Sequence, residues 1–151
     1  MEGKKKESLW AILISLAGCA YILYQTLGVS VVEKTIIDFL VITIVVPAVV
    51  LIISGALLGR KNKLIKSLPC LLIVSVLVFG VSIFSTVYCY ETEMIFEMLK
   101  NTRTANNVVL EINDSITFGT VIQQALICLV CAFIGNGIGN KTVGVLKAIR
   151  N

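Results

Sequence analysis

The sequence contains no histidine and few charged residues. Without histidine, a Ser-His-Asp triad and the usual histidine-containing zinc sites are excluded. Charged residues make up 15% of the chain, whereas they make up about 25% of an ordinary soluble domain. Hydrophobic residues make up 57%, against about 45–50% in soluble domains. A soluble domain of this size keeps a shell of charged residues, so the composition indicates that the solvent is lipid.

Four apolar runs are long enough to cross a bilayer, which takes about 20 residues. They occupy residues 8–27, 36–58, 68–90 and 117–138. Lipid leaves backbone N–H and C=O groups without partners, so each run should be a helix. The tails and connections, the longest of them at 91–116, are too short to hold a soluble domain. The sequence therefore predicts one all-α integral membrane domain over residues 1–151, a four-transmembrane-helix bundle.

The basic residues lie unevenly around these runs. Ten of the 13 lie in the two tails and the second connection, and three lie in the first and third connections. The ten are Lys4, Lys5, Lys6, Arg60, Lys61, Lys63, Lys66, Lys141, Lys147 and Arg150. Since lysine and arginine near span ends stay on the cytoplasmic side, both termini are predicted to be cytoplasmic in a multi-pass protein of the cell membrane. A nucleic-acid partner is not expected, because the basic residues form no folded basic face with aromatic platforms.

A short motif in the first run allows a second interpretation. The sequence Leu-Ala-Gly-Cys at residues 16–19 resembles the lipobox of bacterial lipoprotein precursors. The resemblance implies cleavage before Cys19 and lipidation of its thiol. However, the apolar run continues to residue 27, whereas a cleaved signal gives way to a polar tether, so the length favours an uncleaved span.

Small residues predict where the helices meet. Gly55 and Gly59 in the second run, and Gly135 and Gly139 in the fourth, each form a Gly-x-x-x-Gly motif near the predicted cytoplasmic end. This spacing lets two helix backbones approach closely, so we expect these glycines to pack helices. Pro47 lies inside the second run and lacks a backbone N–H, which predicts a kink near residues 43–47.

Asp38 is the only acidic residue within a run. A carboxylate at the bilayer centre costs about 2.5–3.5 kcal/mol. Asp38 is the third residue of its run, where it can reach headgroups or cap the helix start. In the alternative interpretation, Asp38 and four other polar residues of the outer halves line a shallow cavity open to the outside, as a small transporter or pore requires. The other four are Gln25, Thr86, Gln123 and Gln124.

Two cysteines in the fourth run form the pattern Cys128-x-x-Cys131. Such a pair can cycle between dithiol and disulfide. Four-span quinone-linked thiol oxidoreductases of the vitamin K epoxide reductase kind are similar in carrying such a pair on the fourth span. That resemblance implies thiol redox chemistry, but in that family the pair meets the outer surface and is served by loop cysteines. Here the pair is 11 to 14 residues inside the run and the outer connections contain no cysteine.

The third connection is the one segment large enough to recognise a partner. Met94, Ile95, Met98 and Leu99 share one helical face, which predicts an amphipathic extension of the third helix. Two interpretations stay open for residues 91–116, a solvated lid over the helices and a contact surface.

These features favour a non-enzymatic membrane protein that acts through helix packing and protein–protein contact, as an accessory or immunity-like protein. Its expected partners are the lipid bilayer and another membrane protein or a second copy of itself. No cofactor or metal is expected. A small transporter or oligomeric pore using Asp38 and the polar face of the fourth span is the alternative, and a membrane thiol redox protein using Cys128 and Cys131 is the third.

Overall fold

Helices make up almost all of the chain that the structure describes. The structure is a computed structural model that describes residues 2–60, 64–106 and 116–150, and no strand occurs among them. Six α-helices are joined by short π-helical and 3-10 turns. In chain order these are α1 (Glu2–Leu23), η1 (Tyr24–Gly28), η2 (Val31–Glu33), α2 (Ile36–Leu40), η3 (Val41–Val45), α3 (Val46–Gly59), α4 (Leu64–Glu91), α5 (Met94–Asn106) and α6 (Phe118–Arg150).

Four helical stretches are long and apolar enough to cross a membrane. They are Lys6–Gly28, Ile36–Gly59, Ser67–Glu91 and Phe118–Val143, with mean hydropathies between 1.6 and 3.0. The four helices predicted from the apolar runs are therefore confirmed. The largest difference in their bounds is at the end of the fourth, which reaches Val143 in place of residue 138, because α6 continues without a break through the C-terminal tail.

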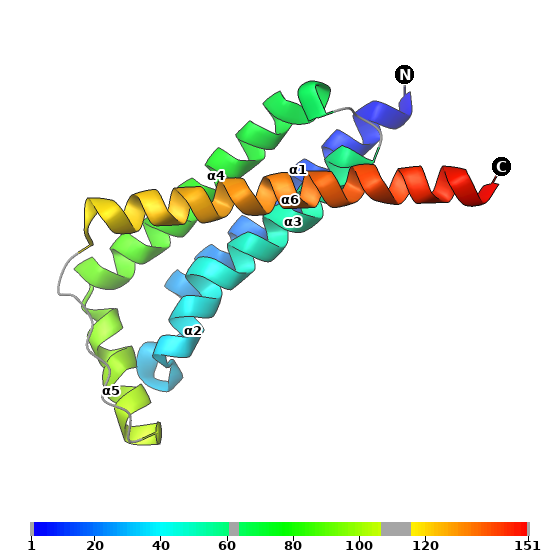
Figure 1. The fold of residues 1–151 in the computed structure, drawn as a ribbon. Coiled ribbons are helices and arrows are strands. Elements are labelled where there is room, and N and C mark those ends of the chain that lie inside the picture. The colour runs from blue at the N-terminus through cyan, green and yellow to red at the C-terminus, as the bar shows by residue number, and fades with distance from the viewer. Residues whose placement is uncertain (1, 61–63, 107–115, 151) are drawn as a thin grey trace.

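α3, which ends the second of these stretches, lies at the centre of the arrangement. It packs against α1, α4 and α6, and Figure 1 shows α6 crossing in front of α3 with α1 behind it. Both termini lie at one end of the molecule, and α5 lies at the opposite end (Figure 1). The described core includes Leu51 and Leu58 of α3, Val78 of α4 and Ala132 of α6.

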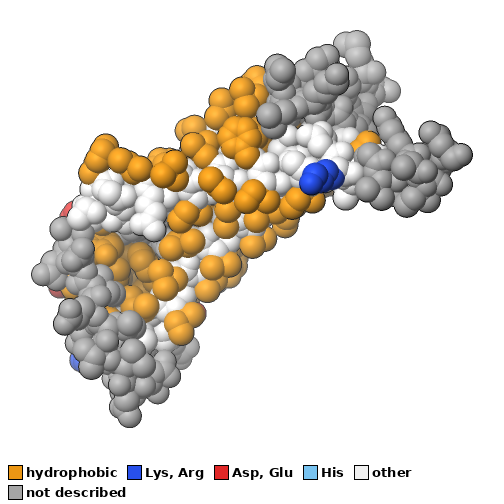
Figure 2. Space-filling model, viewed as in Figure 1, with side chains coloured by type: hydrophobic (Ala, Val, Ile, Leu, Met, Phe, Trp, Pro, Cys, Tyr) orange, Lys and Arg blue, Asp and Glu red, His pale blue; other side chains and the backbone are white. Residues whose placement is uncertain are grey.

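The surface around this core is apolar. Phe118, Leu126, Val130 and Ile134 of α6 are each at least half exposed, and hydrophobic side chains cover much of the face formed by α6, α3 and α4 in Figure 2. An exposed apolar face this continuous is uncommon on a soluble monomer. It is the surface expected where lipid replaces water.

A π-helical turn lies where the sequence predicts a kink. η3 covers Val41–Val45 directly before α3, so the segment from Ile36 to Gly59 is helical throughout but not uniformly α-helical. Proline at position 47 has no N–H for the carbonyl of Thr43, four residues earlier. The wider π turn leaves that carbonyl available to other helices.

The extension predicted for the third helix is wrong in one respect, because α5 is a separate helix. The chain breaks between α4 and α5 at Glu93, whose φ of 59° lies in the left-handed region. After this turn the apolar face predicted for the segment packs onto the molecule itself. Ile95, Met98 and Leu99 are buried together with Ile36 and Cys89.

Candidate functional site

The four glycines singled out in the sequence lie where α3 and α6 cross. A Cβ added to Gly135 would lie 2.8 Å from the Cα of Ile52, and one added to Gly139 would lie 3.0 Å from the Cα of Ala56. The first distance is shorter than real Cβ atoms show, and the Cβ added to Gly139 would also overlap the carbonyl oxygen of Ala56, so the two backbones touch. The contact leaves no room for any side chain at either position.

The contact is reciprocal. A Cβ on Gly55 would lie 3.0 Å from the backbone nitrogen of Asn136, and one on Gly59 would lie 3.1 Å from the Cα of the same residue. Gly137, two residues from Gly135 on the same helix, has no atom within 4 Å of such a Cβ. α6 therefore approaches α3 closely only along the face that carries Gly135 and Gly139, and a glycine on another face makes no such contact.

A second contact joins α6 to the same stretch of chain through hydrogen bonds. The carbonyl oxygen of Thr43 accepts bonds from the hydroxyl of Ser82 at 2.6 Å and from the amide of Gln124 at 2.9 Å. The Gln124 amide also donates to the Ser82 hydroxyl. We call these three groups the Thr43 node. It joins η3, α4 and α6 at the carbonyl that Pro47 cannot bond.

Further polar pairs join other helices inside the molecule. The hydroxyls of Ser15 and Ser54 are 3.0 Å apart and link α1 to α3. The amide of Asn136 donates to the hydroxyl of Ser67 at 3.0 Å and links α6 to α4. All four residues are buried, so these polar groups gain partners where water is excluded.

The polar residues predicted to line one cavity are divided between two hollows. Gln25 and Asp38 line a hollow of about 500 Å³ between the end of α1 and the start of α2. Thr86, Gln123 and Gln124 line a second hollow of about 160 Å³ between η3, α4 and α6. Gln124 is buried in the Thr43 node, whereas Gln123 is exposed.

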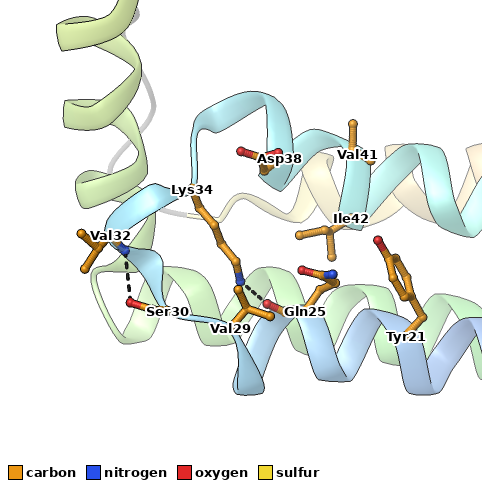
Figure 3. Close-up of a pocket in the computed structure, with 9 residues that line it drawn as sticks. All are labelled: Tyr21, Gln25, Val29, Ser30, Val32, Lys34, Asp38, Val41 and Ile42. Atoms are coloured by element: carbon orange, nitrogen blue, oxygen red, sulfur yellow. Dashed lines mark hydrogen bonds between the residues drawn. The ribbon is translucent and has the colours of Figure 1, made fainter.

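Figure 3 shows the larger hollow, which we call the Lys34 hollow. It is lined by Tyr21, Gln25, Val29, Ser30, Val32, Lys34, Asp38, Val41 and Ile42. Lys34 is only 6% exposed, and its ammonium donates to the backbone carbonyl of Gln25. Burial lowers the pKa of the Lys34 ammonium, and the charge of Asp38 opposes that effect.

Asp38 caps the helix on which it lies. Its Oδ2 accepts bonds from the backbone N–H and the hydroxyl of Thr35, both at 2.8 Å. The hydroxyl of Thr35 in turn accepts from the backbone N–H of Asp38, which completes a capping box at the start of α2. The carboxylate is exposed at the rim of the hollow.

α5, the described helix of the third connection, is docked by polar contacts that the sequence pattern does not reveal. The side-chain amide of Asn101 donates to the carbonyls of Val31, Val32 and Lys34 at 2.9–3.2 Å. The hydroxyl of Thr102 accepts from the backbone N–H of Ile36 at 2.8 Å. These bonds hold α5 against the connection that carries Lys34. The sequence gives no periodic signal for them, because each joins one side chain to irregular backbone.

All five cysteines are free thiols. Cys128 is buried and Cys131 is partly buried on α6, while Cys89 packs at the α5 end. Cys19, the residue of the lipobox resemblance, lies in the last turns of α1 and packs in the core. Within residues 2–60, 64–106 and 116–150, no group of three potential metal ligands comes together.

No family model, no curated protein and no solved structure matches this chain. Function is therefore inferred from the geometry of these contacts and hollows.

Proposed function

We propose that this chain is an integral protein of the cell membrane, a bundle of four transmembrane helices that acts by contact with another membrane protein. In this proposal it is a non-enzymatic accessory or immunity-like protein. The Thr43 node carries the proposal, because it uses buried polar groups of η3, α4 and α6 to bind these segments to one another. A transport path or an active site would instead need such groups to face a substrate.

The positive residues and the fold support the orientation. The start of α1, the end of α3, the start of α4 and the end of α6 lie at one end of the molecule (Figure 1). Ten of the 13 basic residues belong to the two tails and the second connection of the sequence. We place this end in the cytoplasm. α5 then lies on the outer side of the membrane.

The glycines of α3 and α6 pack against each other within the chain, so they are not available to a partner. We therefore place the partner contact at the outer end. On α5 the apolar face is buried, while Phe96, Glu97 and Lys100 are exposed. An aromatic ring flanked by both charge signs is a suitable anchor for a protein contact. The partner is another membrane protein or a second copy of this chain.

Photo-crosslinking tests this proposal. A photoreactive residue in place of Phe96 is compared with one in place of Phe84, which is similarly exposed but lies within α4, in a span. In membranes of the source organism, we expect position 96 to give a discrete protein adduct and position 84 to give lipid adducts. Lipid adducts alone at both positions would contradict a partner at α5.

A small transporter or oligomeric pore is the second candidate, and the Lys34 hollow favours it. The hollow places Asp38 and Gln25 beside an opening of about 500 Å³ at the outer end. Liposome flux measurements with the Asp38→Asn variant distinguish the two. Solute or proton flux that depends on this carboxylate would support transport and overturn the accessory function.

The third candidate is thiol redox chemistry at Cys128 and Cys131, which lie one helical turn apart on α6. It predicts that Cys128→Ser abolishes turnover with a quinone. Unchanged behaviour of this variant in a quinone-reduction assay would exclude it.

A further inference from the structure

The Lys34 hollow contains one positive and one negative side chain that do not pair with each other. Lys34 and Asp38 both line it, yet among the described residues they form no ion pair within 4.0 Å. In Figure 3 the ammonium of Lys34 points to the Gln25 carbonyl, and Asp38 stands on α2 on the other side of the hollow. The two charges therefore stand apart across one opening.

Each charge keeps capacity for a further partner. The ammonium of Lys34 has three N–H donors, and one of them is used by the Gln25 carbonyl. Lys34 is 6% exposed, so its charge is only partly hydrated from the hollow, and the Asp38 charge acts on it from beyond ion-pair distance. At Asp38 both Thr35 bonds end on Oδ2, which leaves the lone pairs of Oδ1.

The walls of the hollow are polar at one end and apolar at the other. Ser30, Val32 and Lys34 belong to the connection between two spans, whereas Tyr21, Val41 and Ile42 belong to the spans. Tyr21 lines the hollow and is exposed, and aromatic rings of this kind prefer the membrane interface. The occupant should therefore be amphiphilic, with its polar group at the level of Lys34.

We infer that the Lys34 hollow binds one phospholipid with a zwitterionic headgroup, such as phosphoethanolamine. The phosphate lies at the Lys34 ammonium, the headgroup ammonium lies at the Asp38 carboxylate, and an acyl chain follows Val41. This site adds a ligand to the protein and rests on the proposed insertion in a bilayer. Lys34 gains the anionic partner that its burial requires.

Other ligand classes fit the lining less well. A purely anionic headgroup leaves Asp38 facing negative charge, and a simple cation leaves Lys34 without a partner. A soluble zwitterion satisfies both charges but leaves the apolar end of the hollow unfilled. The two opposite charges together with the apolar wall select the zwitterionic lipid.

Native mass spectrometry of the full chain tests the site. The protein is extracted from liposomes that contain equal amounts of phosphatidylethanolamine and phosphatidylglycerol, and the lipid retained per chain is measured. The variants are Lys34→Met, which keeps the aliphatic stem, and Asp38→Asn. Lys141→Met, an exposed lysine on α6 at the opposite end of the molecule, is the control, and circular dichroism checks that each variant is folded.

We expect one phosphatidylethanolamine per wild-type chain and a decrease in retention of about tenfold in Lys34→Met, since a charge-assisted hydrogen bond is lost. Asp38→Asn should keep a lipid but lose the preference for phosphatidylethanolamine, because phosphatidylglycerol has no ammonium group. Lys141→Met should behave as wild type.

Three results would overturn the lipid site. They are equal retention of both lipids by wild type, unchanged retention in a folded Lys34→Met variant, and complete displacement of the lipid by soluble phosphoethanolamine. A chain that inserts in liposomes with the predicted orientation but gives any of these results has lost only this site. A chain that fails to insert overturns the proposed membrane function as well.

Discussion

α6 meets the chain segment Ile36–Gly59 at two places that are held together in opposite ways. Toward the end that carries the termini, Gly135 and Gly139 bring two backbones into contact without side chains between them. Toward the α5 end, Gln124 reaches across to the carbonyl of Thr43. Apolar side chains gain nothing by leaving lipid for one another, so helices in a membrane associate through close backbone packing and polar bonds. One pair of helices uses both, each at its own end.

The comparison predicts unequal tolerance to substitution. The glycine contact depends on shape and has no room to adjust, because the opposing atoms are backbone. The Thr43 node has two donors for one carbonyl, so loss of one donor leaves the other.

Gly135→Leu should have the largest effect. Its side chain would be forced into the backbone of Ile52, and we expect the free energy of unfolding to fall by about 3 kcal/mol, as for severe overpacking. Reversible unfolding in mixed detergent micelles, followed by circular dichroism, measures it. Gly137→Leu on the open side of α6 is the control and should change stability by less than about 0.5 kcal/mol. Equal losses in both variants would show that the crossing is not where we place it.

Gln124→Leu should cost less, about 1 kcal/mol, which is the usual value of a hydrogen bond between membrane helices. The carbonyl of Thr43 keeps its bond from Ser82, so it is not left unpaired. The same unfolding assay checks the value. Gln123→Leu, one residue away and exposed, should be nearly neutral, and a larger loss there than at Gln124 would exclude the node.

Pro47→Ala tests whether the missing N–H of Pro47 is the reason that the Thr43 carbonyl binds Ser82 and Gln124. Alanine restores an N–H that can bond the carbonyl of Thr43 within the helix, so this carbonyl no longer depends on α4 and α6. In the Pro47→Ala background, Gln124→Leu should therefore cost less than in wild type, with a coupling energy of about 0.5 kcal/mol in a double-mutant cycle. Strictly additive losses would mean that proline and glutamine act independently.

The smallest effect is the pH dependence of stability contributed by Lys34. Burial lowers the pKa of its ammonium in the folded protein, so the unfolded chain binds more protons between the lowered value and the ordinary one. The free energy of unfolding should rise with pH through that window, and the penalty of burying the charge is complete below it. Unfolding measured from neutral to alkaline pH should show a shallower rise in Lys34→Met than in wild type. Identical slopes would contradict the burial of a charged Lys34.

The four long helices and the α3–α6 contact could be predicted from the sequence, because their signals extend over many residues of one helix. The four apolar runs and the Gly-x-x-x-Gly spacing are properties of a whole helix face, and tertiary contacts do not alter them. Pro47 marks the irregular segment for the same reason, since its missing N–H is fixed by its covalent structure. The partners of Thr43 could not be predicted, because Ser82 and Gln124 reach it from helices distant in sequence.

The candidate sites were harder to predict. Depth along the runs placed Gln25, Asp38 and Gln124 in outer halves, but depth alone does not say which helices are adjacent, so two hollows were expected as one cavity. In the sequence, Lys34 was only one of the three basic residues on the predicted outer side. Its place in a short connection between two apolar runs was the signal that could have marked it as a candidate site residue. Likewise, the apolar face of α5 was readable as a pattern, whereas its burial against Ile36 required the turn at Glu93.

The central claim is that the small and polar faces of the four long helices close on one another within a single chain. Paired cysteines at Ser15 and Ser54, whose hydroxyls are 3.0 Å apart, test it in a chain whose five native cysteines are replaced by alanine. Oxidation in membranes should give an intramolecular disulfide that runs as a monomer. Cysteines at Ser15 and Ile53 should not form it, because Ile53 is 45% exposed and lies about 100° around α3 from Ser54. A Ser15–Ser54 pair that instead joins two chains, or fails to oxidise, would contradict the account.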